Sequence, residues 1–157
     1  MASSPPKYLQ QLDRVRRWHE RFREISEGKV HDRPSDFYQD EVYAFFLNCY
    51  HLKDWIRIDP AASSLSGSVE AFITKTPELA LCADICNGIK HLVSSKPRTV
   101  ERPQFGRRNF KVGVGTQPTM IAIEYTIDTT SGPVDAFDLA TRCVHAWEGF
   151  LGVAPAR

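Results

Sequence analysis

The chain has 157 residues, of which 42% are hydrophobic and 25% are charged, and its formal net charge is +1. This length and composition are typical of one globular domain and exclude an intrinsically disordered chain. The near-zero net charge excludes overall electrostatic attraction as the basis for binding a polyanion or an anionic membrane.

Apolar residues recur at intervals of three and four along five segments, a pattern typical of amphipathic helices. The predicted helices cover residues 8–27, 37–58, 69–75, 77–93 and 134–151. Residues that start or stop helices separate them. Gly28 follows the first helix, Pro60 ends the second, and Thr76 is a suitable N-cap for the third long helix.

Between the last two helices the apolar period changes to two. Alternation runs over 110–115 and again over 121–127, on either side of Pro118, and predicts a β-hairpin at about 109–129. The preceding residues 94–108 have the composition of a loop. Because a lone hairpin is marginally stable in water, its apolar face must pack on the helices or on another chain.

Together these elements predict a mainly α fold class, a four-helix bundle with a β-hairpin inserted before the last helix. We expect a single domain over 7–152, with flexible termini at 1–6 and 153–157. The N-terminal residues lack the pattern of a secretory signal, and no apolar run approaches the ~20 residues that span a bilayer. We therefore expect a cytoplasmic protein that has no membrane partner.

The third long helix carries a polar stripe. Asp84, Asn87 and His91 are spaced at i, i+3 and i+7, which places them along one side of the helix. Histidine exchanges a proton near neutral pH, and a neighbouring amide can orient a phosphate or a hydroxyl group. The pattern therefore indicates a candidate catalytic site at Asn87 and His91. An ordinary solvated helix face is the alternative interpretation.

Residues 86–91 resemble the Arg-Asn-x-x-x-His signature of HEPN domains, the helical nucleotide-binding and ribonuclease domains of toxins and phage-defence systems. Asn87 and His91 match two of the three signature positions, and Cys86 stands where the family has arginine. The resemblance implies a helical bundle that binds RNA or a nucleotide and cleaves RNA without a metal ion. It also implies a homodimer in a defence or toxin–antitoxin setting, with an antitoxin or another protein as partner.

A second polar pair lies on the second long helix. His51 and Asp54 are three residues apart and can meet across one helical turn. If the second and third long helices pack side by side, this pair supplies a further acid–base group to Asn87 and His91. The alternative is a surface hydrogen bond between the two side chains.

The strongest local charge lies in residues 96–111, which hold six basic residues against one acidic residue. Such a segment, close to the polar stripe, predicts contacts with the phosphates of RNA, and a solvated basic loop is the alternative. The predicted nucleic-acid-binding residues are Lys90, Lys96, Arg98, Arg102, Arg107 and Arg108. The candidates for stacking on bases are Tyr50, Trp55 and Phe105.

All four cysteines lie in apolar helical segments, and we interpret them as reduced core residues. We accordingly expect no cofactor and no metal ligand. Two functional alternatives remain beside the nucleic-acid hypothesis. One is a non-catalytic protein-interaction module that uses the edges of the hairpin. The weaker one is a small metalloprotein whose ligands come from three pairs, Cys82 with Cys86, Cys49 with His51, and Cys143 with His145.

Overall fold

The computed structural model describes residues 4–91, 96–113, 115 and 117–156. Its helices are α1 (Lys7–Glu27), α2 (Ser35–Ile58), the 3-10 helix η1 (Pro60–Ala62), α3 (Ser63–Ser66), α4 (Val69–Lys75), α5 (Pro77–His91) and α6 (Ala136–Leu151). Its strands are β1 (Lys29–Val30), β2 (Gln104–Val112), β3 (Met120–Thr129) and β4 (Gly132–Asp135). The prediction of a mostly helical chain with a β-hairpin before the last helix is confirmed. The predicted end of the third long helix, residues 92–93, lies outside the described residues.

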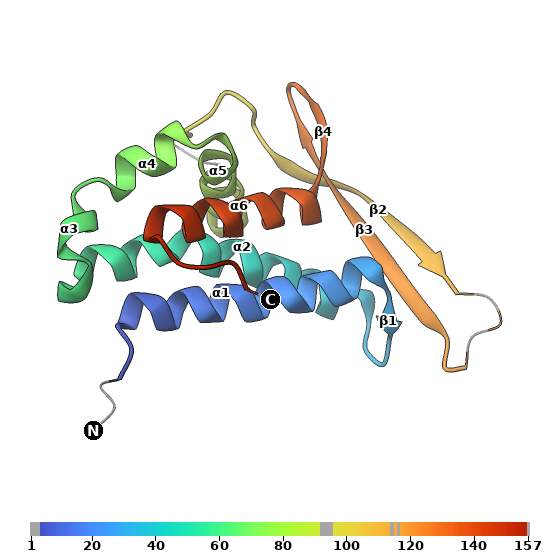
Figure 1. The fold of residues 1–157 in the computed structure, drawn as a ribbon. Coiled ribbons are helices and arrows are strands. Elements are labelled where there is room, and N and C mark those ends of the chain that lie inside the picture. The colour runs from blue at the N-terminus through green and yellow to red at the C-terminus, as the bar shows by residue number, and fades with distance from the viewer. Residues whose placement is uncertain (1–3, 92–95, 114, 116, 157) are drawn as a thin grey trace.

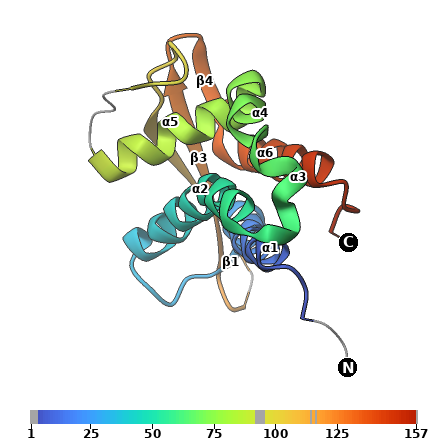
Figure 2. The same ribbon diagram turned by 90° about the vertical axis from the view of Figure 1, so that its left-hand side faces the viewer.

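The four long helices are not all aligned. Figure 1 shows α1, α2 and α6 running side by side, whereas α5 is seen nearly end-on. In the perpendicular view α5 runs across the other three (Figure 2). Helix α2 is the central element, since it packs on α1, α5 and α6. The predicted four-helix bundle is therefore not confirmed, because apolar periodicity reports which face of a helix is buried and not the angle at which helices cross.

The core is formed where α1, α2 and α6 meet. Phe22, Phe46 and Trp147 are among its largest side chains, and all are at most 1% exposed. The indole of Trp147 donates to the carbonyl oxygen of Cys49 at 3.1 Å, which satisfies its only polar atom. Every described helix of the chain is too short or too polar to cross a membrane.

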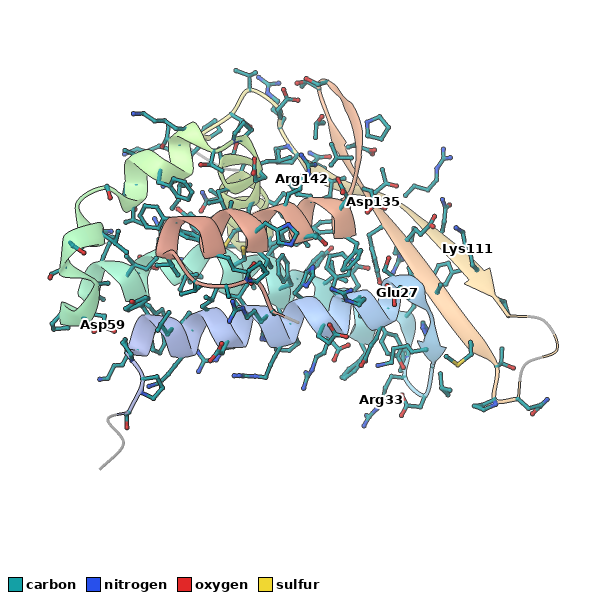
Figure 3. All side chains as sticks on the ribbon, viewed as in Figure 1. Glu27, Arg33, Asp59, Lys111, Asp135 and Arg142 are labelled. Carbon is teal, nitrogen blue, oxygen red and sulfur yellow. The ribbon has the colours of Figure 1, made fainter. Side chains whose placement is uncertain are left out.

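The sheet is larger than the predicted hairpin. Strand β3 pairs with β2 along one edge and, on its other edge, with β1 near its start and with β4 near its end, all antiparallel. Residues 104–108, predicted as loop, therefore belong to β2. A register shift between Phe105 and Arg108 forms a bulge, which interrupts the alternation of inward- and outward-facing residues. The start of the strand therefore lacks the period of two by which strands are predicted. The last helix begins at Ala136 instead of 134, because the preceding residues form β4 and Asp135 caps the helix by accepting from the N–H of Asp138 (Figure 3).

At the inner half of the sheet, one face packs against the helices. Ile123, Tyr125 and Ile127 of β3 are buried there, as the predicted apolar face requires. The outer half of the hairpin extends beyond the helices (Figure 1), and Phe110 and Val112 of β2 are about half exposed. The hairpin therefore both closes the core and leaves an accessible strand.

Described residues near each end of the chain are tied to the rest of the fold. The main chain N–H of Tyr8 donates to Asp59, at the end of α2 (Figure 3), over 3.0 Å. At the other end, Arg16 donates to the carbonyl oxygen of Ala154 at 2.6 Å and also pairs with the buried Glu148. Residues 153–156 thus fold back over α1 and α6.

Candidate functional site

Asp84, the first member of the predicted polar stripe on α5, is a structural anchor. It is 4% exposed and accepts hydrogen bonds from the main chain N–H groups of Arg98 and Thr99, at 2.7 and 2.8 Å. The Thr99 hydroxyl donates to it as well, at 2.6 Å. The segment that follows α5 therefore folds back and is fixed to this helix. The sequence spacing placed Asp84 on the same side of the helix as Asn87 and His91. It could not show that residues 98–99 would cover Asp84.

The other two stripe residues lie toward the end of α5. Asn87 is half-buried and His91 is exposed, and neither side chain makes a hydrogen bond or an ion pair within the described part of the chain. Cys86 faces the interior instead, being 1% exposed. Burial raises the pKa of its thiol to about 11, while the charge of Lys90 acts in the opposite direction. At the position where the HEPN signature has arginine, this chain therefore has a buried, neutral side chain.

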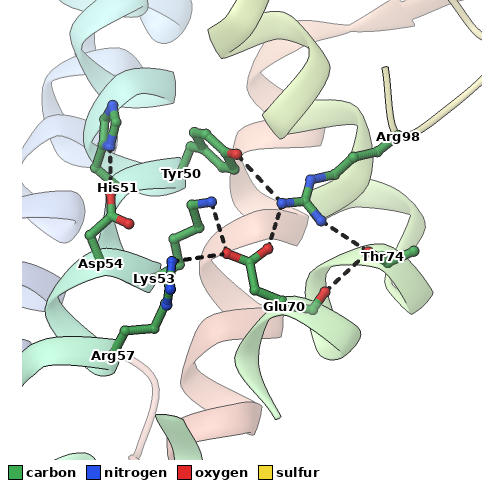
Figure 4. A network of polar contacts seen from close by, with 8 residues as sticks. All are labelled: Tyr50, His51, Lys53, Asp54, Arg57, Glu70, Thr74 and Arg98. Atoms are coloured by element: carbon green, nitrogen blue, oxygen red, sulfur yellow. Dashed lines mark hydrogen bonds and ion pairs between the residues drawn. The ribbon is translucent and has the colours of Figure 1, made fainter. Parts of the chain in front are cut away.

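The predicted pair on α2 is present. His51 Nδ1 lies 2.9 Å from Asp54 Oδ2, and both side chains are more than 40% exposed (Figure 4). Among the described residues, no hydrogen bond or ion pair links this pair to Asn87 or His91. The structure thus agrees with a surface hydrogen bond and does not join the two polar groups into one site.

Arg98, predicted to contact phosphate, is held by other side chains (Figure 4). Its guanidinium pairs with Glu70 at 2.6 Å, donates to Thr74 Oγ1 at 2.9 Å and reaches the Tyr50 hydroxyl at 3.5 Å. Glu70 also accepts from Lys53 at 2.9 Å. Burial raises the pKa of Glu70, but hydrogen bonds from Lys53 and Arg98 outweigh it and the net shift is downward. Arg98 therefore fixes the segment after α5 onto α4.

We expect Glu70→Gln to lower the free energy of unfolding by about 1 kcal/mol, because Lys53 and Arg98 lose their carboxylate while the site stays partly open to solvent. Asp54→Asn removes an exposed pair of similar geometry and should cost less than about 0.5 kcal/mol. Urea denaturation of both variants measures the difference. Equal losses would show that the Glu70 cluster is no more than a surface contact.

The remaining predicted basic residues differ in their surroundings. Arg108 donates to Gln39 at 2.8 Å and lies 3.7 Å from Asp36. The other four are exposed and make no ion pair with a described residue; they are Lys90, Lys96, Arg102 and Arg107. Of these four, Arg102 lines a cavity beside α5. Arg102 therefore lies at a concave site, whereas Lys90, Lys96 and Arg107 are exposed cations without an ion-pair partner among the described residues.

That cavity is a groove of about 780 Å³ between α5, α2 and the segment that Asp84 anchors. Its lining includes Tyr43, Ile85, Ile89, Pro97, Arg102 and Phe105. The rings of Tyr43 and Phe105 lie 4.8 Å apart at 56° and form an aromatic wall. The volume is in the range of small-molecule sites, which are typically apolar with a few polar groups. Sequence reasoning could not locate the groove, because it forms only when residues 97–105 fold back onto α5.

Arg102 occupies the groove wall in a strained conformation. Its φ of 45° lies in the left-handed region, which is rare for residues other than glycine. The preceding residue is held firmly, since the side chain of Glu101 accepts from the hydroxyl and the N–H of Ser131 at 2.7 and 3.0 Å. These hydrogen bonds lower the pKa of Glu101. The surrounding contacts thus impose the conformation that places Arg102 at the groove.

A second group of reactive side chains lies in the core. The Sγ atoms of Cys49 on α2, Cys82 on α5 and Cys143 on α6 are all within 4.8 Å of one another. Burial raises the pKa of the Cys49 thiol, whereas its contacts with the Cys143 and Cys82 thiols lower it, and the net shift is downward. The cluster takes one residue from each pair considered from sequence, and Cys86, His51 and His145 are not part of it.

Comparisons of the chain with known protein families, with curated proteins and with solved structures found no match. The resemblance to HEPN domains therefore stays a prediction from residues 86–91.

Proposed function

We propose that the protein binds a ligand that combines a nucleobase with a phosphate, either a nucleotide or a segment of single-stranded RNA, in the groove beside α5. The observation that carries this proposal is the position of Arg102, which is held in a strained conformation at the wall of an aromatic-lined groove. Non-glycine residues in this backbone region cost about 1–3 kcal/mol and concentrate at ligand sites.

The apolar part of the groove suits a base. Phe105, Tyr43 and Ile89 offer aromatic and aliphatic surface, and Gln104 adds an amide that can donate to or accept from a base edge. Stacking of a base on an aromatic side chain contributes about 1–3 kcal/mol and depends little on which base is stacked. The groove should therefore accept several bases with similar affinity.

The phosphate would lie on the basic side of the groove. Arg102 lines it directly, and the exposed Lys90 and Lys96 are next in sequence to the lining residues Ile89 and Pro97. Cations in such an arrangement attract a phosphate and make binding weaken as salt rises. Asn87 and His91, one turn apart near the same end of α5, would face the ligand's ribose or phosphate.

The surroundings of α5 favour binding of RNA over its cleavage. The buried Cys86 cannot provide the charge that arginine gives to the HEPN signature, and among the described residues the His51–Asp54 pair makes no hydrogen bond or ion pair with His91. We therefore limit the proposal to binding, with His91→Ala as the test for any metal-independent cleavage. The homodimer and the defence or toxin–antitoxin setting are proposals that rest on the HEPN resemblance alone.

A second candidate function is the capture of an extended protein segment by β2. This strand pairs only with β3 among the described strands, and its outer edge is free to hydrogen-bond another strand. Residues 104–112 carry three basic residues and no acidic one. A second copy of β2 would bring like charges together, so the partner strand would be acidic. Exposed Phe110 and Val112 would add apolar contacts.

Arg102→Gly tests the groove directly. Glycine removes the guanidinium and relieves the strained φ, so the variant should be at least as stable as the wild type. Its affinity for uridine or adenosine monophosphate, and for oligouridine, should fall about tenfold or more through loss of the phosphate contact. Arg107→Ala, which removes an exposed cation outside the groove, is the matched control.

Fluorescence or calorimetric titration at fixed salt gives the affinities for each ligand. Stronger binding of oligouridine than of the monophosphates would identify RNA as the ligand class, and the reverse order would identify a nucleotide. If Arg102→Gly and Arg107→Ala lose affinity equally, binding depends on general surface charge and the groove proposal is wrong.

A further inference from the structure

The three cysteines at the junction of α2, α5 and α6 form a cluster that the groove does not use. Cys49, Cys82 and Cys143 are each at most 1% exposed. They come from positions far apart in the sequence, so their convergence is a product of the fold. Cys86 provides an internal comparison, because it is equally buried and lies one turn from Cys82 on the same helix but is not part of the cluster.

The separations suit one shared ion. Zn²⁺ binds thiolate sulfur at about 2.3 Å, which places three sulfurs around one ion about 3.8–4.0 Å apart. The observed separations are all within 4.8 Å, so each sulfur has to move by less than about 1 Å, which a small side-chain rotation provides. A disulfide needs sulfurs about 2.05 Å apart and would leave the third thiol without a role.

The donor set determines the kind of ion. The cluster consists only of sulfur, and soft thiolate ligands select Zn²⁺, Cu⁺ and similar thiophilic ions over Mg²⁺ or Ca²⁺. The Cys143 thiol donates to the carbonyl oxygen of Glu78 at 3.3 Å, and the Cys82 thiol donates to that of Phe46 at 3.7 Å. Both thiols would give up these weak hydrogen bonds when they bind an ion.

We propose that Cys49, Cys82 and Cys143 bind one thiophilic metal ion as three thiolates. For a divalent ion the reaction is M²⁺ + 3 RSH → M(SR)₃⁻ + 3 H⁺, in which three S–H bonds break, three metal–sulfur bonds form and the protons pass to the solvent. The bound ion joins α2, α5 and α6 at one point. Because the site is buried, the ion enters while the chain folds or when these helices transiently separate.

The test uses the full chain, refolded under anaerobic reducing conditions with Zn²⁺, Cd²⁺ or Cu⁺ in separate experiments. After gel filtration, the wild type should retain about one ion per chain and melt at a higher temperature than the metal-free protein. Cys82→Ala should weaken retention about a hundredfold or more, because a direct ligand is lost. Cys86→Ala should bind like the wild type. Circular dichroism checks that both variants are folded.

X-ray absorption of the wild type gives a readout that does not depend on any variant. The expected result is a coordination shell of three sulfurs at about 2.3 Å for zinc. The proposal is overturned if the wild type retains none of the three ions, if Cys86→Ala loses as much metal as Cys82→Ala, or if the shell consists of nitrogen and oxygen. None of these results depends on nucleotide binding, so failure here leaves the groove proposal standing.

Discussion

Replacing Asp84 with alanine is expected to lower the free energy of unfolding by about 2–3 kcal/mol and to open the groove. The carboxylate accepts from two main chain N–H groups and one hydroxyl, and it is nearly inaccessible to solvent. Hydrogen bonds to a charged group contribute about 1.5–3 kcal/mol each, but residues 98–99 can recover part of this loss by moving into water. The segment that carries Arg102 should then detach from α5, and ligand affinity should fall with it.

Urea denaturation and amide hydrogen exchange measure the two consequences of Asp84→Ala. The amides of Arg98 and Thr99 should lose their protection, whereas those in the middle of α2 should keep theirs. Asp54→Ala, which removes an exposed carboxylate, is the control and should leave the amides of Arg98 and Thr99 unchanged. Unchanged protection at these two amides in Asp84→Ala would contradict the role of Asp84 as the anchor of the groove.

The second large effect is a loss of stability in mild acid caused by His19. This side chain on α1 is 8% exposed and stacks on Phe137 with ring centroids 5.1 Å apart. The hydroxyl of Thr141 donates to the carbonyl oxygen of Phe137, so His19 Nε2 donates to Thr141 Oγ1, at 2.9 Å. Burial, followed by the charge of Arg23, lowers the pKa of His19 from 6.5 to about 4.

Because its pKa is lowered, His19 stays neutral in the folded protein between about pH 6.5 and 4, whereas in the unfolded chain the same side chain binds a proton. Stability is therefore full above about pH 6.5 and decreases as the pH falls toward 4, by about 3 kcal/mol in total. In His19→Phe the stacking is kept and this slope between pH 6.5 and 4 should largely disappear. His91→Gln, at an exposed position, should keep it. An unchanged slope in His19→Phe would show that another group causes the acid sensitivity.

The helices were predictable because burial of one helical face requires apolar residues at regular intervals, and these intervals are visible in the sequence. α2 was expected over 37–58 and is observed over Ser35–Ile58. The sheet was only partly predictable. β1 has two residues, and β4 contains Gly132 and Pro133, which are typical of turns, so neither has a recognisable strand pattern. β1 forms because β3 offers it hydrogen-bonding partners from a distant part of the chain, whereas β4 pairs with β3 across the tight turn that joins them.

The candidate site was predictable only as a set of residues on α5. Spacing correctly placed Asn87 and His91 on its accessible side, but it grouped them with Asp84, which the segment after α5 covers. Charge alone could not distinguish Arg98, neutralised by Glu70, from Arg102, which lines the groove. In each case the deciding partner is a residue distant in the sequence, and composition and local spacing carry no information on such contacts.

Helix α5 connects the two proposed sites. Ile85 and Ile89 face the groove, while Cys82 contributes to the thiol cluster in the core. An ion bound to the cluster would fix α5 relative to α2 and α6. The groove is built on the same helix, so a metal-loaded protein should hold its ligand in a better-defined geometry.

The most direct test of the central claim is to fill the groove at Gly88. This residue lines the groove on α5, and a Cβ placed there meets no atom within 4 Å. Gly88→Leu and Gly88→Ala should both fold, and the helix should gain stability because glycine is unfavourable in a helix interior by about 0.5–1 kcal/mol. We predict that titration with uridine monophosphate or oligouridine detects binding to Gly88→Ala but about tenfold or more weaker binding to Gly88→Leu. Equal binding by both variants would contradict the assignment of the ligand site to this groove.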